Sequence, residues 1–376
     1  MKRIISFSVL VFGFVLQSHA QVSRVGVKEN WSTDLSRTTI SLYEFEALTP
    51  RSAFQSIDNP RFYNEETSKE YYDANENVVV VSAGREYKAY PLEFLIFHQV
   101  INDRIGGVPI AVTYCPFTDA VIVYERRFTH RGVQRELLLK PSGMIRKSNI
   151  VLYDQQTESW WQQYNGTAKV GHFLGTELKQ VCSLRMTMKD FYENCKYGLV
   201  IKDNVKDELL PYGINPYYKY DNVLTEKPLY LNYMPSEKLM PMETVLLVDL
   251  RGNNIIYPLE DLQQRKVLND LPMDMYVVVF YEANSTSMLG GREIKTNDKQ
   301  GSMAAYSSFH DGRLLTFSSE GNHFIDEQTK SIWNFNGLCI DGSLKGQQLK
   351  QLMSKQSFAF VALDFYRNSL IYNINW

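Results

Sequence analysis

The chain has 376 residues, a formal net charge of −2, 44% hydrophobic residues and 22% charged residues. These values are ordinary for a folded globular protein, and the length favours two domains. A nearly neutral, slightly acidic chain lacks the basic surface that nucleic-acid binding requires, so we expect no nucleic-acid partner.

The N-terminal segment has the three parts of a secretory signal. Lys2 and Arg3 precede an apolar run over residues 4–16, and Ser18 and Ala20 supply the small residues of a cleavage site. We therefore predict a signal peptide over residues 1–20 and a periplasmic or secreted mature protein. No later stretch is apolar and long enough to span a bilayer, so we expect no membrane span after signal cleavage.

An internal repeat organises the rest of the chain. The motif Tyr90-Pro91-Leu92-Glu93 returns as Tyr257-Pro258-Leu259-Glu260, and later matches keep an offset of about 170 residues. A repeat of this size indicates two tandem related domains from a duplication, with an α+β, β-rich fold. We expect an N-terminal arm at 21–77, a first repeat domain at 78–235 and a second at 236–376.

The first repeat opens with a predicted hairpin that turns at Gly84. Residues 92–100 then have the apolar spacing of a helix, which we expect to end near Asn102-Asp103. Two further strands are predicted over 109–115 and 120–125. A helix capped by Thr187 follows, and residues 211–222, rich in Tyr, Pro, Gly and Asn, read as the linker between the repeats.

Four cysteines remain after signal cleavage: Cys115, Cys182, Cys195 and Cys339. An oxidising compartment permits disulfides, and four cysteines allow three full connectivities. Cys182 and Cys195 are close enough in sequence to pair, but geometry must decide.

Many ordered motifs of the mature chain resemble the bacterial and archaeal domain of unknown function 3179 family. The matching segments cover residues 57–62, 90–92, 98–103, 106–109, 112–116, 142–143, 148–149, 154–161 and 215–217, together with Trp333. The resemblance implies an exported or lipid-anchored protein. It also implies thiol or selenol chemistry in part of the family, at a Cys-Pro-x-Cys motif. This chain has Cys115 but carries Thr118 in place of the second cysteine, so a two-thiol cycle within the motif is not available.

Cys115 leads the candidate catalytic residues, with His98 and Tyr114 as its helpers. The positions of Cys115 and His98 hold Glu282 and Arg265 in the second repeat, so the fold itself does not require them. A neighbouring histidine lowers a thiol pKa and activates a nucleophile, and a Cys with a His also suits a soft metal. A buried, purely structural cysteine is the competing interpretation.

The candidate binding residues include several that recur in both repeats, for which a framework role is favoured. Asn-Asp pairs satisfy loose backbone groups, Asp154 with Thr157 is typical of a turn, and Trp161 is typical of a core anchor. The full set of candidates is Asn102, Asp103, Asp119, Asn149, Asp154 and Trp161.

Two classes of function remain. The first is an envelope binding or scaffold protein, with a small molecule or an envelope protein as partner, and this class is favoured because the second motif cysteine is missing. The second is a single-cysteine enzyme, or a redox or metal-binding protein, that uses Cys115. Phosphate-binding glycine loops, HExxH and GxSxG motifs are absent, so the sequence assigns no cofactor and no metal.

Overall fold

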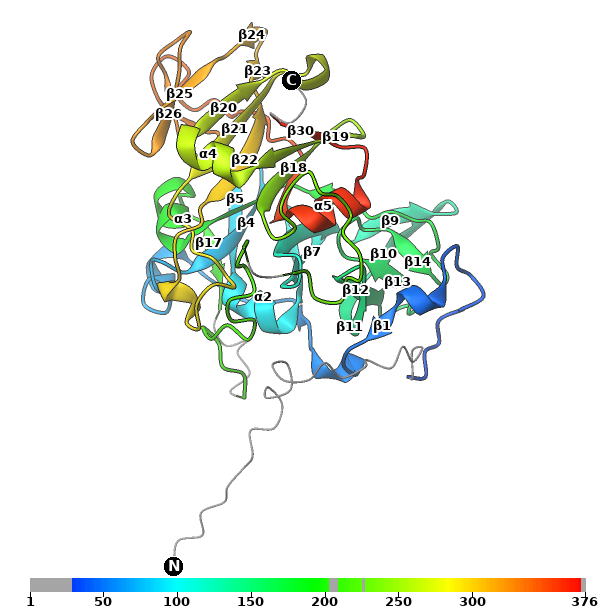
Figure 1. The fold of residues 1–376 in the computed structure, drawn as a ribbon. Helices are drawn as coiled ribbons and strands as arrows, with labels where there is room; N and C mark the ends of the chain where they lie inside the picture. Colours follow the sequence, from blue (N-terminus) through cyan, green and yellow to red (C-terminus); the bar gives the residue numbers. More distant parts are fainter. Residues whose placement is uncertain (1–28, 203–208, 225–226, 373–376) are drawn as a thin grey trace, which may run out of the picture.

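A computed structural model describes residues 29–202, 209–224 and 227–372 of the chain (Figure 1). The predicted signal peptide, residues 1–20, lies outside the described residues. Strands account for 42% of the structure and helices for 13%, which confirms the β-rich prediction. Within the described ranges, no helix is long and apolar enough to cross a membrane.

The first half of the chain builds three sheets and a hairpin. One sheet has the strand order β16 (Ser183–Thr187), β4 (Asn77–Ala83), β5 (Glu86–Pro91), β17 (Leu199–Ile201), β3 (Phe62–Tyr63). A second has the order β15 (Gln180–Val181), β8 (Ala120–Glu125), β7 (Val108–Cys115), β6 (Val100–Ile105), β2 (Ile57–Asp58). The third has the order β1 (Glu46–Ala47), β11 (Leu139–Arg146), β12 (Asn149–Asp154), β13 (Trp160–Gln162), β14 (Ala168–Val170), and the hairpin joins β9 (Arg127–His130) to β10 (Val133–Glu136).

The second half builds a similar set. Its first sheet has the strand order β29 (Ser354–Phe358), β18 (Thr244–Leu250), β19 (Asn253–Pro258), β30 (Leu370–Ile371). The second has the order β20 (Val267–Asp270), β21 (Val277–Glu282), β22 (Ser302–Ser307). The third has the order β25 (Phe317–Glu320), β26 (His323–Asp326), β27 (Ile332–Trp333), β28 (Cys339–Asp341). A hairpin joins β23 (Phe309–His310) to β24 (Arg313–Leu314).

Short helices and 3-10 turns connect these strands. The α-helices are α1 (Glu65–Ser68), α2 (Leu92–His98), α3 (Met188–Asn194), α4 (Leu259–Arg265) and α5 (Ala359–Phe365). The 3-10 turns include Leu42–Glu44, Arg51–Ala53, Pro272–Asp274 and Ile294–Thr296.

The two halves share details of pairing as well as strand order. The first sheet of each half contains one parallel pair, β17 against β5 in the first half and β30 against β19 in the second. The third sheets also shift register at corresponding places, between Trp160 and Trp161 and between Ile332 and Trp333.

The predicted hairpins form because β-branched runs meet at glycine turns. The strand β4 places four buried valines, residues 78–81, against β5, and Gly84 turns the chain with a φ of +62°. Glycine adopts this left-handed conformation without the steric penalty that a Cβ imposes.

The predicted end of the following helix is wrong. Helix α2 stops at His98, because Gln99 takes a left-handed conformation with a φ of 60° and its N–H bonds to the carbonyl of Leu95. Asn102 and Asp103 therefore lie in strand β6, between β2 and β7, and not at a helix terminus. Pairing with two neighbouring strands outweighed the local helical spacing that reached Val100.

The predicted cap of the helix after residue 187 is confirmed. Thr187 accepts a hydrogen bond from the N–H of Asp190 through its hydroxyl, and α3 begins at Met188. Between β17 and β18 the described residues form neither helix nor strand, which agrees with the linker predicted there.

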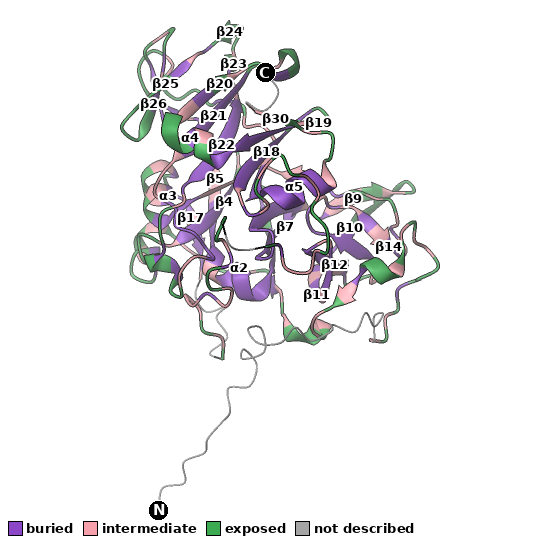
Figure 2. Ribbon diagram, in the orientation of Figure 1, coloured by how far each residue is buried: buried purple, intermediate pink, exposed green. Residues whose placement is uncertain are grey.

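One apolar core runs through both halves. It joins Val81 and Phe191 of the first half to Phe280, Tyr306 and Phe358 of the second. Strand β8 packs on β29, and β16 packs on β22. Figure 2 shows the buried residues concentrated on the central strands, with the exposed residues mainly on loops and on α4.

We predict that Trp161→Phe and Trp333→Phe each lower the free energy of unfolding, by about 3 kcal/mol, and by similar amounts. Each change removes buried volume and a hydrogen bond to a carboxylate, because both indole N–H groups donate to an aspartate at 2.9 Å. Chemical denaturation of the purified variants measures both values.

Trp160→Phe is the matched control. Trp160 is also fully buried, but its indole nitrogen makes no hydrogen bond within the described part of the chain. This variant should therefore cost less than the other two. An equal cost for all three variants would contradict a role for the Asp–Trp hydrogen bonds.

Candidate functional site

Cys115 is the last residue of β7 and is fully buried. Its backbone carbonyl accepts the N–H and the hydroxyl of Thr118 at 3.3 and 3.4 Å. Around the thiol, the Thr118 side chain and the backbone N–H groups of Ile150, Thr118 and Phe117 act to lower the pKa of Cys115. These donors favour the thiolate, but burial has the larger effect and raises the pKa of Cys115 above its usual value. The group is therefore a protonated thiol at neutral pH.

His98 does not serve Cys115. Its Nδ1 is 2.6 Å from the carbonyl oxygen of Gln55, and its Nε2 is 2.7 Å from the hydroxyl of Tyr212. The ring is buried and nearly parallel to that of Tyr212. His98 thus ties helix α2 to the N-terminal arm and to the linker, and both of its ring nitrogens have partners other than a thiol.

Tyr114 and Asp119 do lie together, with a partner that the sequence did not suggest. The Tyr114 hydroxyl donates to Asp119 Oδ1 at 2.9 Å, and Arg185 contacts both carboxylate oxygens at 3.0 and 3.1 Å. Burial first, and then the charge of Asp119, raise the pKa of Tyr114 well above its usual value. The phenol therefore stays protonated and acts as a donor.

Arg185 lies on β16, and its side chain is only 9% exposed, which is unusual for a charged residue. The second repeat has Gln356 at the equivalent place, and that contrast is the signal that could have identified Arg185.

The side chain of Asn149 is hydrogen-bonded to the turn that follows Cys115. Its Nδ2 donates to Thr118 Oγ1 at 3.3 Å and to Gln163 Oε1 at 2.8 Å. Its Oδ1 accepts from Gln162 Nε2 at 2.7 Å and from the N–H of Tyr164 at 2.9 Å. Because buried amides are costly without partners, this satisfied network holds the turn in one conformation.

The four recurring candidates make the same contacts in both halves. Asn102 exchanges two hydrogen bonds with the backbone of Leu139, and Asn269 does the same with Phe317. Asp103 accepts a hydrogen bond from the Tyr90 hydroxyl, and Asp270 accepts one from the Tyr257 hydroxyl. Asp154 accepts a hydrogen bond from the Trp161 indole, and Asp326 accepts one from the Trp333 indole. Contacts repeated in this way indicate a framework role.

The second-half counterpart of Cys115 occupies an equivalent turn. Glu282 ends β21, and its carboxylate accepts the N–H groups of Asn284 and Ser285 and the hydroxyl of Ser285. These donors are two and three residues further along the chain, as they are for Cys115. Burial is the main cause that raises the pKa of Glu282, to about 7.

A metal centre has no support at these positions. Within residues 29–202, 209–224 and 227–372, no group of three or more His, Cys, Asp or Glu side chains could hold a metal ion. The four cysteines are free thiols, so Cys182 and Cys195 are not joined.

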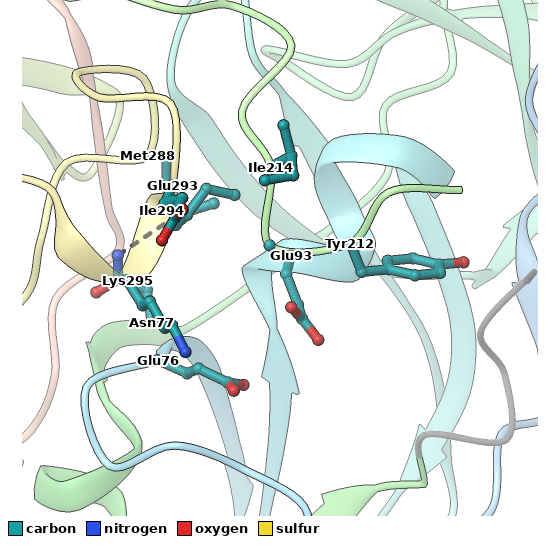
Figure 3. Close-up of a pocket in the computed structure, with 10 residues that line it drawn as sticks. Glu76, Asn77, Glu93, Tyr212, Ile214, Met288, Glu293, Ile294 and Lys295 are labelled. Carbon is teal, nitrogen blue, oxygen red and sulfur yellow. Dashed lines mark hydrogen bonds between the residues drawn. The ribbon is translucent and has the colours of Figure 1, made fainter. Parts of the chain in front are cut away.

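A cavity of about 220 Å³ lies where the two halves meet the linker (Figure 3). Its walls are tied together by hydrogen bonds from Asn77 Nδ2 to the Thr286 carbonyl (2.8 Å), from the Ile294 N–H to the Gly213 carbonyl (2.9 Å), and from the Asn215 N–H to the Arg292 carbonyl (2.8 Å). The lining residues are Glu76, Asn77, Glu93, Tyr212, Gly213, Ile214, Met288, Glu293, Ile294 and Lys295.

The lining of this cavity includes three carboxylates and one amine. Figure 3 shows the side chains of Glu76 and Glu93 on neighbouring walls, and Glu293 adds a third carboxylate against the single amine of Lys295. Tyr212, which His98 positions through its hydroxyl, forms another wall. His98 therefore contacts a residue that lines this cavity.

A family model described as "Protein of unknown function (DUF3179)" matches residues 51–369. The chain belongs to the DUF3179 family. Neither the curated proteins nor the solved structures include one that matches it. In this DUF3179 protein, Thr118 stands where the second cysteine of the motif was expected, and its hydroxyl donates to the backbone carbonyl of Cys115 at 3.4 Å.

We predict that Cys115 of the native DUF3179 protein reacts with iodoacetamide at least about tenfold more slowly than in the unfolded chain, because it is buried and protonated. The half-buried Cys182 should be modified first. Peptide mapping by mass spectrometry after timed labelling measures both rates.

His98→Gln should leave the labelling rate of Cys115 unchanged, since the ring of His98 contacts Gln55 and Tyr212. Labelling of native Cys115 at the unfolded rate, or a clear change in His98→Gln, would show that the thiol is activated after all.

We predict that the DUF3179 protein loses stability as the pH rises from about 4.5 to about 7, because the pKa of Glu282 is raised from 4.5 to about 7 in the folded state. Over this range the folded state binds more protons than the unfolded state, so a rising pH favours unfolding, by up to about 3 kcal/mol for one group. Glu282→Gln should flatten this dependence and raise the melting temperature above pH 7. Glu327→Gln, at an exposed position, serves as the control. Identical pH profiles of stability for wild type and Glu282→Gln would show that Glu282 does not cause the pH dependence.

Proposed function

We propose that this DUF3179 protein is an exported binding protein of the cell envelope, periplasmic or secreted, that performs no chemistry at Cys115. The charged start, apolar run and small-residue cleavage pattern of residues 1–20 support export. The observation that carries the binding function is the cavity at the junction, whose walls come from both halves and from the linker.

We also propose that the two halves arose by tandem duplication, with repeat domains at residues 78–235 and 236–376. The shared sheet orders, the shared register shifts and the paired Asp–Trp and Asn–backbone contacts support this proposal. A duplicated pair of domains offers a ligand a site at its junction, where pockets commonly occur.

The charge of the cavity selects the class of ligand. The lining includes the carboxylates of Glu76, Glu93 and Glu293 and the amine of Lys295. Carboxylates attract a small molecule with an amine or ammonium group, which is the class of ligand proposed for this site. A volume of about 220 Å³ suits a compact ligand.

Thiol chemistry at Cys115 is the second candidate function. The backbone N–H groups of Ile150, Thr118 and Phe117 favour it, since they act to lower the pKa of the thiol. Such an enzyme, redox protein or metal-binding protein would need the turn to open, because Cys115 is fully buried in the closed structure.

We predict that small amines bind the purified protein and that Glu93→Gln weakens this binding about tenfold, because one carboxylate of the cavity is lost. Isothermal titration with n-butylamine, 1,4-diaminobutane and choline measures the affinities, and n-butanol is the uncharged comparison.

Glu260→Gln is the matched control variant. Glu260 occupies the same place in the first turn of α4 that Glu93 occupies in α2, but it is exposed and does not line the cavity. Amines that bind no more tightly than n-butanol, or an equal effect of both variants, would remove the support for this site.

A further inference from the structure

The N-terminal arm adds a strand to the second sheet of the first half. Strand β2 runs parallel to β6, with Ile57 opposite Ile101 and Asp58 opposite Asn102. The N–H of Asn59 donates to the carbonyl of Asn102 at 2.8 Å, and Asn102 Nδ2 donates to Asp58 Oδ1 at 2.8 Å. Asn102 is fully buried in this arrangement. One short extended segment thus satisfies both the main chain and a side chain at this edge.

The matching edge of the second half has no such strand. The corresponding sheet has the order β20, β21, β22, and no strand of the described ranges pairs with the outer edge of β20. Asn269 takes the place of Asn102 and keeps the two hydrogen bonds to a backbone, here that of Phe317. Asn269 is exposed, however, and among the described residues its Nδ2 donates to no second acceptor. The edge of β20 is therefore open to an added strand.

Exposed apolar side chains lie next to this edge and form an apolar rim of Leu271, Met273, Tyr276 and Phe309. Leu271 and Met273 follow β20 in the chain, and the register of β20 with β21 brings Leu271 opposite Tyr276. The rings of Tyr276 and Phe309 are stacked, with their centroids 6.0 Å apart. Figure 1 shows β20 and β21 next to the β23–β24 hairpin, which carries Phe309.

The first half is polar where the second half has the apolar rim. Leu271 corresponds to Arg104, which forms an ion pair with Glu136, and Tyr276 corresponds to Pro109. The fold therefore does not require apolar side chains at these positions. They are present in the half whose sheet edge has no strand from the arm.

We propose that the outer edge of β20 binds an extended segment of a partner protein, in which a branched apolar residue is followed by Asp or Asn. The segment pairs in parallel with β20, as β2 does with β6, so its main chain bonds to that of Asn269. Its carboxylate or amide oxygen accepts the second hydrogen of Asn269 Nδ2. The residues that follow it in the segment contact Leu271 and Met273, which removes apolar surface from water.

The size of the surface favours a short segment over a second copy of this chain. The surface consists of residues 267–276 and Phe309, whereas a stable interface between two proteins takes roughly 20 residues or more from each side. Strand addition gains its affinity from main-chain hydrogen bonds, so a few residues are enough. The arm of a second copy is already engaged with its own β6.

This inference goes beyond the amine site proposed above and is independent of it. No residue of β20 or of the apolar rim lines the cavity at the junction. Binding at one site can therefore fail while binding at the other is observed.

A synthetic peptide with the sequence of residues 54–60, Phe-Gln-Ser-Ile-Asp-Asn-Pro, tests the proposal on the purified protein. The arm of the chain occupies β6, so β20 is the matching edge that remains for the added peptide. A fluorescence anisotropy titration should show binding, and hydrogen exchange at the amides of β20 should slow. N-methylation of the Asn residue of the peptide removes the donor equivalent to the N–H of Asn59 and should weaken binding about tenfold.

Leu271→Asp should weaken binding of the unmodified peptide about tenfold, because it removes an apolar contact and adds a charge that repels the Asp of the peptide. Val133→Asp in the first half is the matched control and should bind like wild type. It makes the same change of charge at a residue that is also 48% exposed, so both variants should fold.

The proposal is overturned if the peptide does not bind, if the N-methylated peptide binds equally well, or if Leu271→Asp binds like Val133→Asp. Analytical ultracentrifugation covers the other occupant. A dimer that Leu271→Asp dissociates, in a protein that does not bind the peptide, would assign this edge to a second copy of the chain instead.

Discussion

The apolar core that runs through both halves is the constraint on which the geometry of every candidate site depends. Strand β8 packs on β29, and β16 packs on β22. Strands of the first half that solvent would reach in a single sheet are therefore covered by strands of the second half. The turn after Cys115 shows the consequence. The carbonyl of Thr118 accepts the N–H of Phe358 at 3.0 Å, and the carbonyl of Phe117 accepts the Tyr220 hydroxyl at 3.1 Å, so the second half and the linker both seal it.

Polar groups inside this core are tolerated because they are saturated with partners. Asp119 and Arg185 form a buried pair that also engages Tyr114, and the side-chain amides around Asn149 satisfy one another. Removal of one partner leaves a buried charge or amide without a hydrogen bond. The free energy lost in this way exceeds the net stabilisation that the pair itself provides. These networks define one conformation of the Cys115 turn, and burial in that conformation keeps the pKa of the thiol above its usual value.

The cavity at the junction has a different origin from these networks. Its lining comes from both halves and from the segment between β17 and β18, and it includes the carboxylates of Glu76, Glu93 and Glu293. The proposed binding function thus depends on residues that the two halves do not share, while the framework depends on residues that recur in both.

The sequence by itself determined the family, the β-rich class, the hairpins at Gly84 and Gly252 and the capped helix at Thr187, because each depends on residues that are neighbours along the chain. It also indicated that Asp154 and Trp161 are framework residues, since their copies recur in the second repeat with the same spacing. Only the tertiary structure decided where helix α2 ends, what His98 contacts and whether Cys115 is accessible. The contacts of Arg185 with Asp119 and the lining of the cavity at the junction come from segments far apart in sequence. Their contacts are set by how the halves pack on one core, and no local pattern encodes that packing.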